Sequence, residues 1–207
     1  MNTQEKSIGI NNEHEAVETL AKSAGYKEHK MGKHSQRIAH YCKLLAKTAG
    51  LNEKIQDTAF YASQVYDLGK VGIPDSVLLK AGKLDDRELE VMKTHSRLGY
   101  DILKYSKTRY LKAGAVIAYS HHEKYDGSGY PIGLKGETIP ILGRIVAIAD
   151  VFDALTHERV YKKAWSIEEA CQFLVEEKGK HFDPSLVEDF IQHIDEVKSI
   201  KTEFSDT

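Results

Sequence analysis

Apolar residues recur at three- and four-residue spacing along most of this chain, which is typical of helices with one buried face. The clearest stripe is Ile38, Tyr41 and Leu45, and Gly50 follows it as a stop signal. No stretch alternates apolar and polar residues between hairpin turns, and no internal repeat is present. The pattern predicts an all-α fold, in one bundle of helices.

Local signals predict where these helices begin and end. His34 begins a second helix, a third runs from Asn52 and holds Asp67 in its last turn, and Pro140 opens an apolar helix around Asp150. Four starts are indicated by capping boxes or by a cap before a proline: Asn12 with Glu15, Asp85 with Glu88, Ser166 with Glu169, and Asp183 with Pro184. Gly25 is expected to end the first helix. We expect one domain over residues 12–197, with flexible ends at 1–11 and 198–207.

Composition narrows the class of protein. The 207 residues suit a single domain, and a formal net charge of -2 provides no broad basic surface for a nucleic acid polymer. No apolar segment is long enough for a signal peptide or for membrane insertion. Cys42 and Cys171 lie far apart in the sequence, which argues against a disulfide framework. We therefore expect a cytoplasmic location.

Polar residues with metal-binding groups interrupt the apolar pattern at several places. His121 and His122 precede a loop with two glycines and a proline, while four other residues stand in or beside apolar stripes: His34, Asp67, His95 and Asp150. A carboxylate on an apolar face costs several kcal/mol unless it is paired or bound to metal. Buried salt bridges to Lys or Arg are the alternative for the two aspartates. Taken together, imidazole and carboxylate groups favour iron, manganese or zinc over calcium or magnesium.

Five motifs in the chain closely resemble those of the HD-GYP family, over roughly residues 12–195. They are His34-Ser35-x-Arg37-Ile38, Asp67-Leu68-Gly69-Lys70-Val71-Gly72-Ile73-Pro74-Asp75, Met92-Lys93-x-His95, the stretch from His121 to Pro131, and Ala149-Asp150-Val151-Phe152-Asp153-Ala154-Leu155-Thr156. The resemblance implies a helical fold and hydrolysis of cyclic di-GMP at a metal centre between helices. By position, the implied metal ligands are His34, Tyr66, Asp67, His95, His121, His122 and Asp150.

The same resemblance implies roles for further residues. Two transition metal ions, iron or manganese, are expected, with Asp67 bridging them and Asp67 and Lys70 in catalysis. Lys70, Arg159, Lys162 and Tyr130 are expected to contact the substrate; the alternative for the cations is a solvated surface. The loop Gly129-Tyr130-Pro131 is a candidate contact for a diguanylate cyclase (GGDEF) partner, or simply a tight turn.

One position departs from the family pattern. The family has His-Asp where this chain has Tyr66-Asp67, and a phenol with an ordinary pKa near 10 binds best, as phenolate, to a hard ion such as ferric iron. The first metal position is therefore expected to be weak. Lys30 replaces the glutamate of trinuclear members, which argues against a third metal. Glu123 and Asp126 are expected either to orient ligand histidines or to lie on the loop surface.

Three functions follow from these patterns. The first is a metal-dependent phosphodiesterase for cyclic di-GMP or a related cyclic dinucleotide, with activity reduced by Tyr66. The second is a catalytically degenerate module that binds metal or nucleotide and signals through a partner, which Tyr66 favours. The third is another phosphohydrolase of the wider HD superfamily, acting on mononucleotides.

Overall fold

A computed structural model of the protein describes residues 3–27, 33–158 and 163–205, with side chains from residue 12 onward. Within these ranges the regular elements are helices, and one isolated bridge joins Lys178 to Phe182. The α-helices and short 3-10 helices (η) are α1 (Thr3–Lys27), α2 (Lys33–Thr48), α3 (Glu53–Ala62), η1 (Ser63–Val65), η2 (Leu68–Gly72), α4 (Asp75–Leu78), α5 (Asp86–Leu103), α6 (Arg109–Ser120), η3 (Gly136–Thr138), α7 (Ile141–Thr156), α8 (Ile167–Glu176), α9 (Pro184–Gln192) and α10 (Ile194–Glu203). The predicted all-α class is confirmed.

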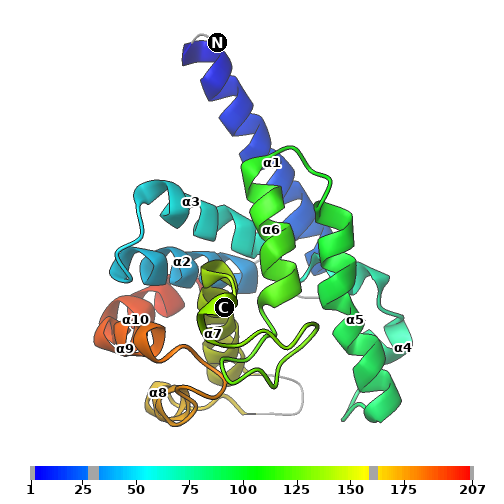
Figure 1. Ribbon diagram of the computed structural model, residues 1–207, viewed down its shortest axis with the longest axis vertical. Coiled ribbons are helices and arrows are strands. Elements are labelled where there is room, and N and C mark those ends of the chain that lie inside the picture. The colour runs from blue at the N-terminus through cyan, green and yellow to red at the C-terminus, as the bar shows by residue number, and fades with distance from the viewer. Residues whose placement is uncertain (1–2, 28–32, 159–162, 206–207) are drawn as a thin grey trace.

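Helix α7 lies near the middle of the bundle, as its uniformly apolar sequence predicts (Figure 1). Helices α5 and α6 pack side by side at one side of it, and α8, α9 and α10 lie at the other (Figure 1). Helix α2 crosses against α3 and α7. This arrangement brings the end of α6 and the middle of α5 toward the segment that links η1 to η2.

Two clusters of buried apolar residues form the core. In the larger one Tyr41, Phe152 and Phe190 meet edge to face, with ring centroids 5.1 to 6.3 Å apart, in the geometry that aromatic pairs prefer. The smaller one joins α1, α5 and α6 through Val17, Leu103 and neighbouring residues. Between η1 and η2, Asp67 lies between Tyr66, which belongs to the larger cluster, and Leu68, which belongs to the smaller one.

Local capping signals predicted several helix starts correctly. Helices α5 and α8 begin with complete capping boxes, at Asp85 with Glu88 and at Ser166 with Glu169. Asp183 accepts hydrogen bonds from the first turn of α9, and a proline follows it. These signals succeed because each cap is satisfied within four residues of sequence.

The start of the chain differs from the prediction. Helix α1 begins at Thr3, so Asn12 and Glu15 lie inside it, and it continues past Gly25 to Lys27. The segment 3–11 contains one glycine and no proline, so nothing in it forces a helix to stop. Asp67 is also not in a long helix; it precedes the 3-10 helix η2, where Gly69 packs against α5.

The end of the chain is more ordered than predicted. The expected last helix is two helices with a break at His193, and α10 continues through residues that were expected to fray. Tertiary contacts explain this order: Val197 is fully buried, and the Arg37 guanidinium donates to the Phe204 carbonyl oxygen over 2.8 Å. The Lys201 ammonium donates to the Thr156 carbonyl oxygen over 2.9 Å.

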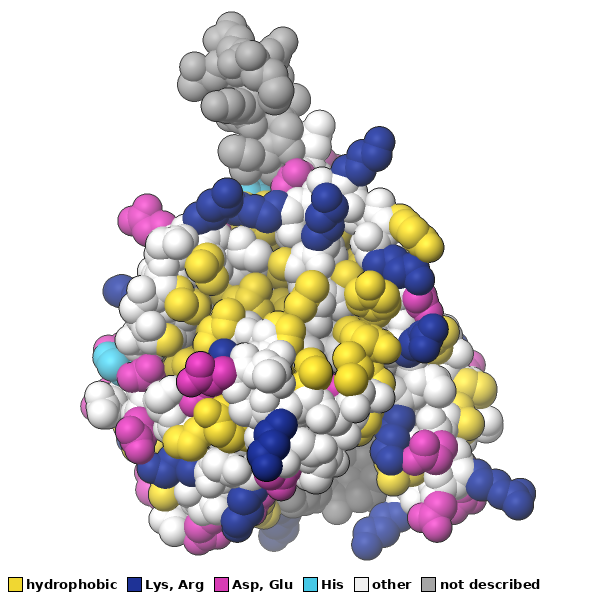
Figure 2. All heavy atoms as spheres, viewed as in Figure 1, with side chains coloured by type: hydrophobic (Ala, Val, Ile, Leu, Met, Phe, Trp, Pro, Cys, Tyr) yellow, Lys and Arg dark blue, Asp and Glu magenta, His cyan; other side chains and the backbone are white. Residues whose placement is uncertain are grey.

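The surface carries mixed charge. Figure 2 shows Lys and Arg side chains interspersed with Asp and Glu over one face of the molecule, in keeping with a formal net charge of -2. None of the helices in the described ranges is long and apolar enough to cross a membrane.

Candidate metal centre

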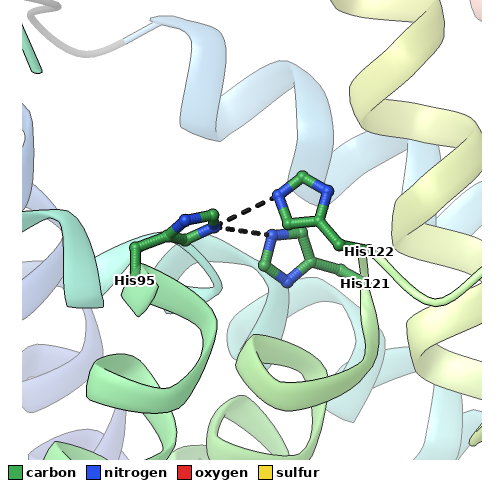
Figure 3. Close-up of side chains that lie close together, drawn as sticks. All are labelled: His95, His121 and His122. Atoms are coloured by element: carbon green, nitrogen blue, oxygen red, sulfur yellow. Dashed lines mark hydrogen bonds between the residues drawn. The ribbon is translucent and has the colours of Figure 1, made fainter. Parts of the chain in front are cut away.

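Three histidine rings from two helices point their nitrogens at one another (Figure 3). His95 comes from the middle of α5, and His121 and His122 follow the last residue of α6. The His95 Nε2 atom lies 3.1 Å from His122 Nε2 and 3.4 Å from His121 Nε2. Such close nitrogens, all within 4.8 Å of one another, form a ligand group of the kind that holds a transition metal.

A buried carboxylate adds oxygen to this group. The Asp67 Oδ1 atom lies 3.5 Å from His95 Nε2 and 3.7 Å from His121 Nε2. It is buried and has no hydrogen-bond donor among the described residues, while Oδ2 accepts from the Lys70 ammonium over 2.6 Å. A buried carboxylate oxygen without a partner is costly, and a cation at this place would satisfy it. The residues present therefore fit a metal ion.

Backbone carbonyls orient two of the rings. The Nδ1 atom of His95 lies 2.6 Å from the Met92 carbonyl oxygen, and Nδ1 of His121 lies 3.1 Å from that of Ile117. With the hydrogen on Nδ1, each Nε2 keeps its lone pair for a metal. Burial lowers the pKa of His121 to about 4 and holds the pKa of His122 well below its ordinary value. The His121 and His122 rings are therefore neutral at neutral pH, as metal ligands must be.

The carboxyl of Asp67 is ionised in this site. Burial by itself raises its pKa, but the Lys70 ammonium, in direct contact with the carboxylate, opposes burial and the pKa is lowered overall. Lys70, which is predicted to contact the substrate, thus binds the Asp67 carboxylate directly. The other predicted phosphate contacts, Arg159 and Lys162, lie outside the described residues, as does Lys30.

A second group of polar side chains lies next to the first, and its members bind one another. The Tyr66 hydroxyl donates to Asp150 Oδ1 over 2.7 Å and lies 3.1 Å from His34 Nε2. The Tyr66 ring packs at right angles to His121, with centroids 5.0 Å apart, so the two groups are adjacent. The structure thus places His34, Tyr66 and Asp150 together, as predicted ligands should be, but joins them by hydrogen bonds through the phenol.

Asp153 completes this second group, and the sequence reasoning gave it no role. Its Oδ2 atom lies 2.7 Å from His34 Nδ1, and its Oδ1 accepts from Arg37 Nε over 2.7 Å. Burial raises the pKa of Asp153, but hydrogen bonds from His34 and Arg37 outweigh it and lower the pKa to about 2. Spacing in the sequence could have indicated this role. Arg37 follows His34 by three residues, and Asp153 follows Asp150 by three residues, so each pair shares a face of its own helix.

The loop after His122 is held by Glu123. Its buried carboxylate accepts from the backbone N–H groups of Ile132, Gly133 and Leu134, at 2.8 to 3.2 Å. Asp126 likewise accepts from the backbone N–H of the next-but-one residue, Ser128. Of the two alternatives for these carboxylates, a place on the loop surface fits Asp126, which is exposed, whereas Glu123 is buried and holds the turns of the loop.

Tyr130 in this loop contacts a candidate ligand. Its ring stacks on the His122 ring at a centroid distance of 4.7 Å, and its backbone N–H donates to the His122 carbonyl oxygen over 3.1 Å. Gly129 makes this approach possible, because a Cβ atom there would lie 2.2 Å from the Lys124 backbone nitrogen. The two contacts fix the position of His122 from the side of the loop.

Comparison with known proteins places this architecture in a family. A family model described as "HD domain" matches residues 18–186. The chain is 44% identical to the "Cyclic di-GMP phosphodiesterase response regulator RpfG" of Xanthomonas campestris. This match covers 93% of this chain and 51% of that protein. It is 47% identical to the "3'3'-cGAMP-specific phosphodiesterase 2" of Vibrio cholerae, over 93% of this chain and 37% of that protein. The chain therefore spans about half of the length of the first of these relatives and less of the second.

Solved structures agree on the fold. A cyclic GMP-AMP specific phosphodiesterase of Vibrio cholerae matches 94% of this chain and 51% of its own with a TM-score of 0.69, at 22% identity. An HDG"Y"P protein from Bdellovibrio bacteriovorus matches 94% of this chain and 65% of its own with a TM-score of 0.65, at 16% identity. With the family match, the motifs and the helical fold in agreement, the chain belongs to the HD-domain family and to its HD-GYP group, with Tyr66-Asp67 in place of His-Asp.

Proposed function

We propose that this chain hydrolyses a phosphodiester bond of a cyclic dinucleotide, cyclic di-GMP or cyclic GMP-AMP, with a bound transition metal. The observation that carries the proposal is the convergence of three imidazole nitrogens on a buried carboxylate oxygen without a partner. Relatives at 44% and 47% identity carry the names of phosphodiesterases for these two compounds, which supports the substrate class.

Four residues would hold the metal: Asp67, His95, His121 and His122. Iron or manganese suits this set of imidazole and carboxylate ligands without thiolates. When bound, such an ion supplies Lewis-acid activation of water and neutralises charge on the phosphoryl oxygens. In the overall reaction water adds to phosphorus, one P–O bond to a sugar breaks, and the released sugar oxygen takes a proton, which gives a linear dinucleotide.

The chain's own residues prepare the site for this reaction. Lys70 brings a positive charge to within 2.6 Å of Asp67, where it can offset the negative charge of an arriving phosphodiester. Tyr130 holds His122 by stacking. Arg159 and Lys162 stay predicted phosphate contacts.

We expect one tightly held metal ion at this centre. The other expected position involves His34, Tyr66 and Asp150, whose polar atoms already make hydrogen bonds at 2.7 and 3.1 Å. A second ion there would have to break those bonds, so we expect it to bind weakly. This agrees with the expectation that Tyr66 reduces activity.

The test is turnover by metal-loaded protein. Protein prepared without oxygen and loaded with Fe²⁺ or Mn²⁺ is mixed with cyclic di-GMP or cyclic GMP-AMP, and products are separated by chromatography. We expect a linear dinucleotide, and a loss of at least about a hundredfold in rate in His122→Ala, which removes a metal ligand. Metal-loaded native protein that forms no product from either compound would refute the proposed activity.

A second candidate function is a degenerate module that binds the dinucleotide and signals without cleaving it. The Tyr66 to Asp150 hydrogen bond favours it, because the phenol occupies groups that a second metal would need. Binding of cyclic di-GMP without any product would identify this function. Contact with a GGDEF partner through the Gly129 to Pro131 loop stays a prediction, and pull-down with a diguanylate cyclase, using Pro131→Ala as the variant, tests it.

A further inference from the structure

A cavity of about 450 Å³ opens between α1, α2 and α3, away from the ligand side chains themselves. This volume lies within the range of roughly 300 to 1,000 Å³ that is usual for small-molecule sites. Its walls include two aromatic side chains, Phe60 and His40, and two amides, Gln36 and Gln64. Nothing in the reaction chemistry described above uses these four side chains.

The cavity adjoins Asp67 and the second polar group, which contains His34 and Tyr66. Ala21, Gly25, Ser35 and Gln64 line it and also line a second, small pocket that contains His34, Tyr66 and Asp67. A compound with a phosphate beside Asp67 can therefore extend a neighbouring group into the cavity. In a cyclic dinucleotide the groups next to the phosphates are riboses that carry purine bases.

Building on the proposed function, we infer that this cavity binds one purine base of the cyclic dinucleotide. The Phe60 and His40 rings provide flat apolar surface, on which nucleobases stack irrespective of their sequence. The two rings pack edge to face with centroids 5.0 Å apart, so they form a fixed corner rather than two independent side chains. His40 is held further by stacking on Phe204, at 4.5 Å.

The amides supply hydrogen bonds for the edge of the base. The Gln64 amide nitrogen donates to the Phe60 carbonyl oxygen over 3.3 Å, which leaves the amide oxygen to accept from an exocyclic amine. Gln36 is exposed at the wall and can donate to a ring nitrogen or carbonyl. A purine fits better than a second phosphate, because the charge of Lys22, the lysine among the described lining residues, is accompanied by that of Glu18, while aromatic and amide side chains make up much of the wall.

Two substitutions test the inference. Phe60→Ala removes the stacking surface and Gln36→Ala removes an exposed hydrogen-bonding group without disturbing the core. Tyr105→Ala is the matched control, because this ring is 84% exposed and does not line the cavity. Affinity for cyclic di-GMP is measured by calorimetry, and hydrolysis is compared between cyclic di-GMP and bis(4-nitrophenyl) phosphate, a diester that has no base.

We expect Phe60→Ala to weaken cyclic di-GMP binding about tenfold, the usual scale of one stacked base, and Gln36→Ala about threefold. Both should lower the ratio of kcat/KM for cyclic di-GMP to that for the base-free diester, and Tyr105→Ala should not. Affinity unchanged in both variants, or a ratio unchanged in both, would overturn the inference. Native protein that binds cyclic di-GMP but hydrolyses neither diester would refute the proposed activity alone, since the affinities of the variants would still decide the role of the cavity.

Discussion

Tyr66 determines how many groups near Asp67 are available to a metal. Its hydroxyl reaches Asp150 at 2.7 Å and His34 at 3.1 Å, so one phenol joins two side chains that are predicted to be ligands. An imidazole at this position would offer a nitrogen lone pair, whereas the neutral phenol donates a hydrogen bond.

Replacing Tyr66 with histidine should therefore increase the metal content. We expect about one equivalent of iron or manganese in the native protein, a clear increase toward two in Tyr66→His, and no increase in Tyr66→Phe. Elemental analysis of protein loaded under identical conditions measures this directly. Two full equivalents in the native protein would show that the hydrogen bonds of the phenol do not exclude an ion.

The spectrum of the iron-loaded, air-exposed protein provides a control. A tyrosine bound to ferric iron as phenolate would give a visible charge-transfer band that Tyr66→Phe abolishes. Because the hydroxyl donates to Asp150, we expect no such band in the native protein.

Asp153 should be among the most important residues for stability. It is 2% exposed and shares its charge with Arg37, which is 1% exposed. Asp153→Ala leaves the buried guanidinium without its carboxylate, so we expect the free energy of unfolding to fall by about 3 to 5 kcal/mol. Denaturant unfolding of metal-free protein measures this loss.

Asp57→Ala is the matched control, because Asp57 bonds Lys43 over 3.1 Å between side chains that are both 47% exposed. Loss of this exposed ion pair should lower the free energy of unfolding by under about 1 kcal/mol. Equal losses in both variants would contradict the expected importance of burial.

The candidate metal ligands were easier to predict from the sequence than the residues that hold the surrounding structure. Histidines such as His95 and His121 stand out because imidazole is unusual on an apolar helix face. Asp153 and Glu123 were harder to assign, since their partners lie on another helix or nine and more residues away along the chain. A carboxylate gives no local sign of which donor it will meet.

At the scale of elements, the 3-10 helix η2 packs against α5 through a glycine, Gly69, that has no room for a side chain. A Cβ atom at Gly69 would lie 1.9 Å from the His95 carbonyl oxygen and 2.4 Å from the Gly99 backbone nitrogen. Glycine thus allows the turn after Asp67 to lie directly on the part of α5 that carries His95.

Gly69→Ala should separate these two elements. We expect a loss of roughly 1 to 3 kcal/mol in stability, and a weaker affinity for metal because Asp67 moves relative to His95. Thermal unfolding and metal titration measure the two effects. Gly72→Ala is the control, because its added Cβ meets only the end of the Leu98 side chain, at 2.9 Å, which can turn away. Full metal affinity in Gly69→Ala would contradict this role for η2.

Helix boundaries were predictable where their causes are local. The capping boxes of α5 and α8 satisfy their own backbone groups, so the sequence alone indicates them. The order of α10 depends instead on the Arg37 and Lys201 bonds to distant carbonyls, and no pattern within residues 194–203 contains that information.

At the scale of the whole molecule, the candidate metal centre joins segments from separate parts of the chain. His95 comes from α5, His121 and His122 from the end of α6, and Asp67 from the segment before η2. A bound ion would therefore tie together α5, the end of α6 and the segment before η2.

Removal of metal should therefore lower the thermal stability of the native protein. A ligand at a hundred times its Kd stabilises the folded state by about 2.7 kcal/mol, which corresponds to roughly 5 to 10 °C in Tm for a chain of this size. Calorimetry before and after treatment with a chelator measures the change. His122→Ala, which lacks a ligand, should show little response to the chelator. The same Tm with and without metal in the native protein would mean that the ion does not connect these helices.

The phenol between His34 and Asp150 also has a genetic meaning. Tyrosine is encoded by TAT and TAC and histidine by CAT and CAC, so a single T to C transition at the first base of codon 66 exchanges them. A growing bacterial population samples that transition continually. If rapid removal of the dinucleotide were favoured, a histidine codon should arise at this position in laboratory evolution sooner than any exchange that needs two base changes.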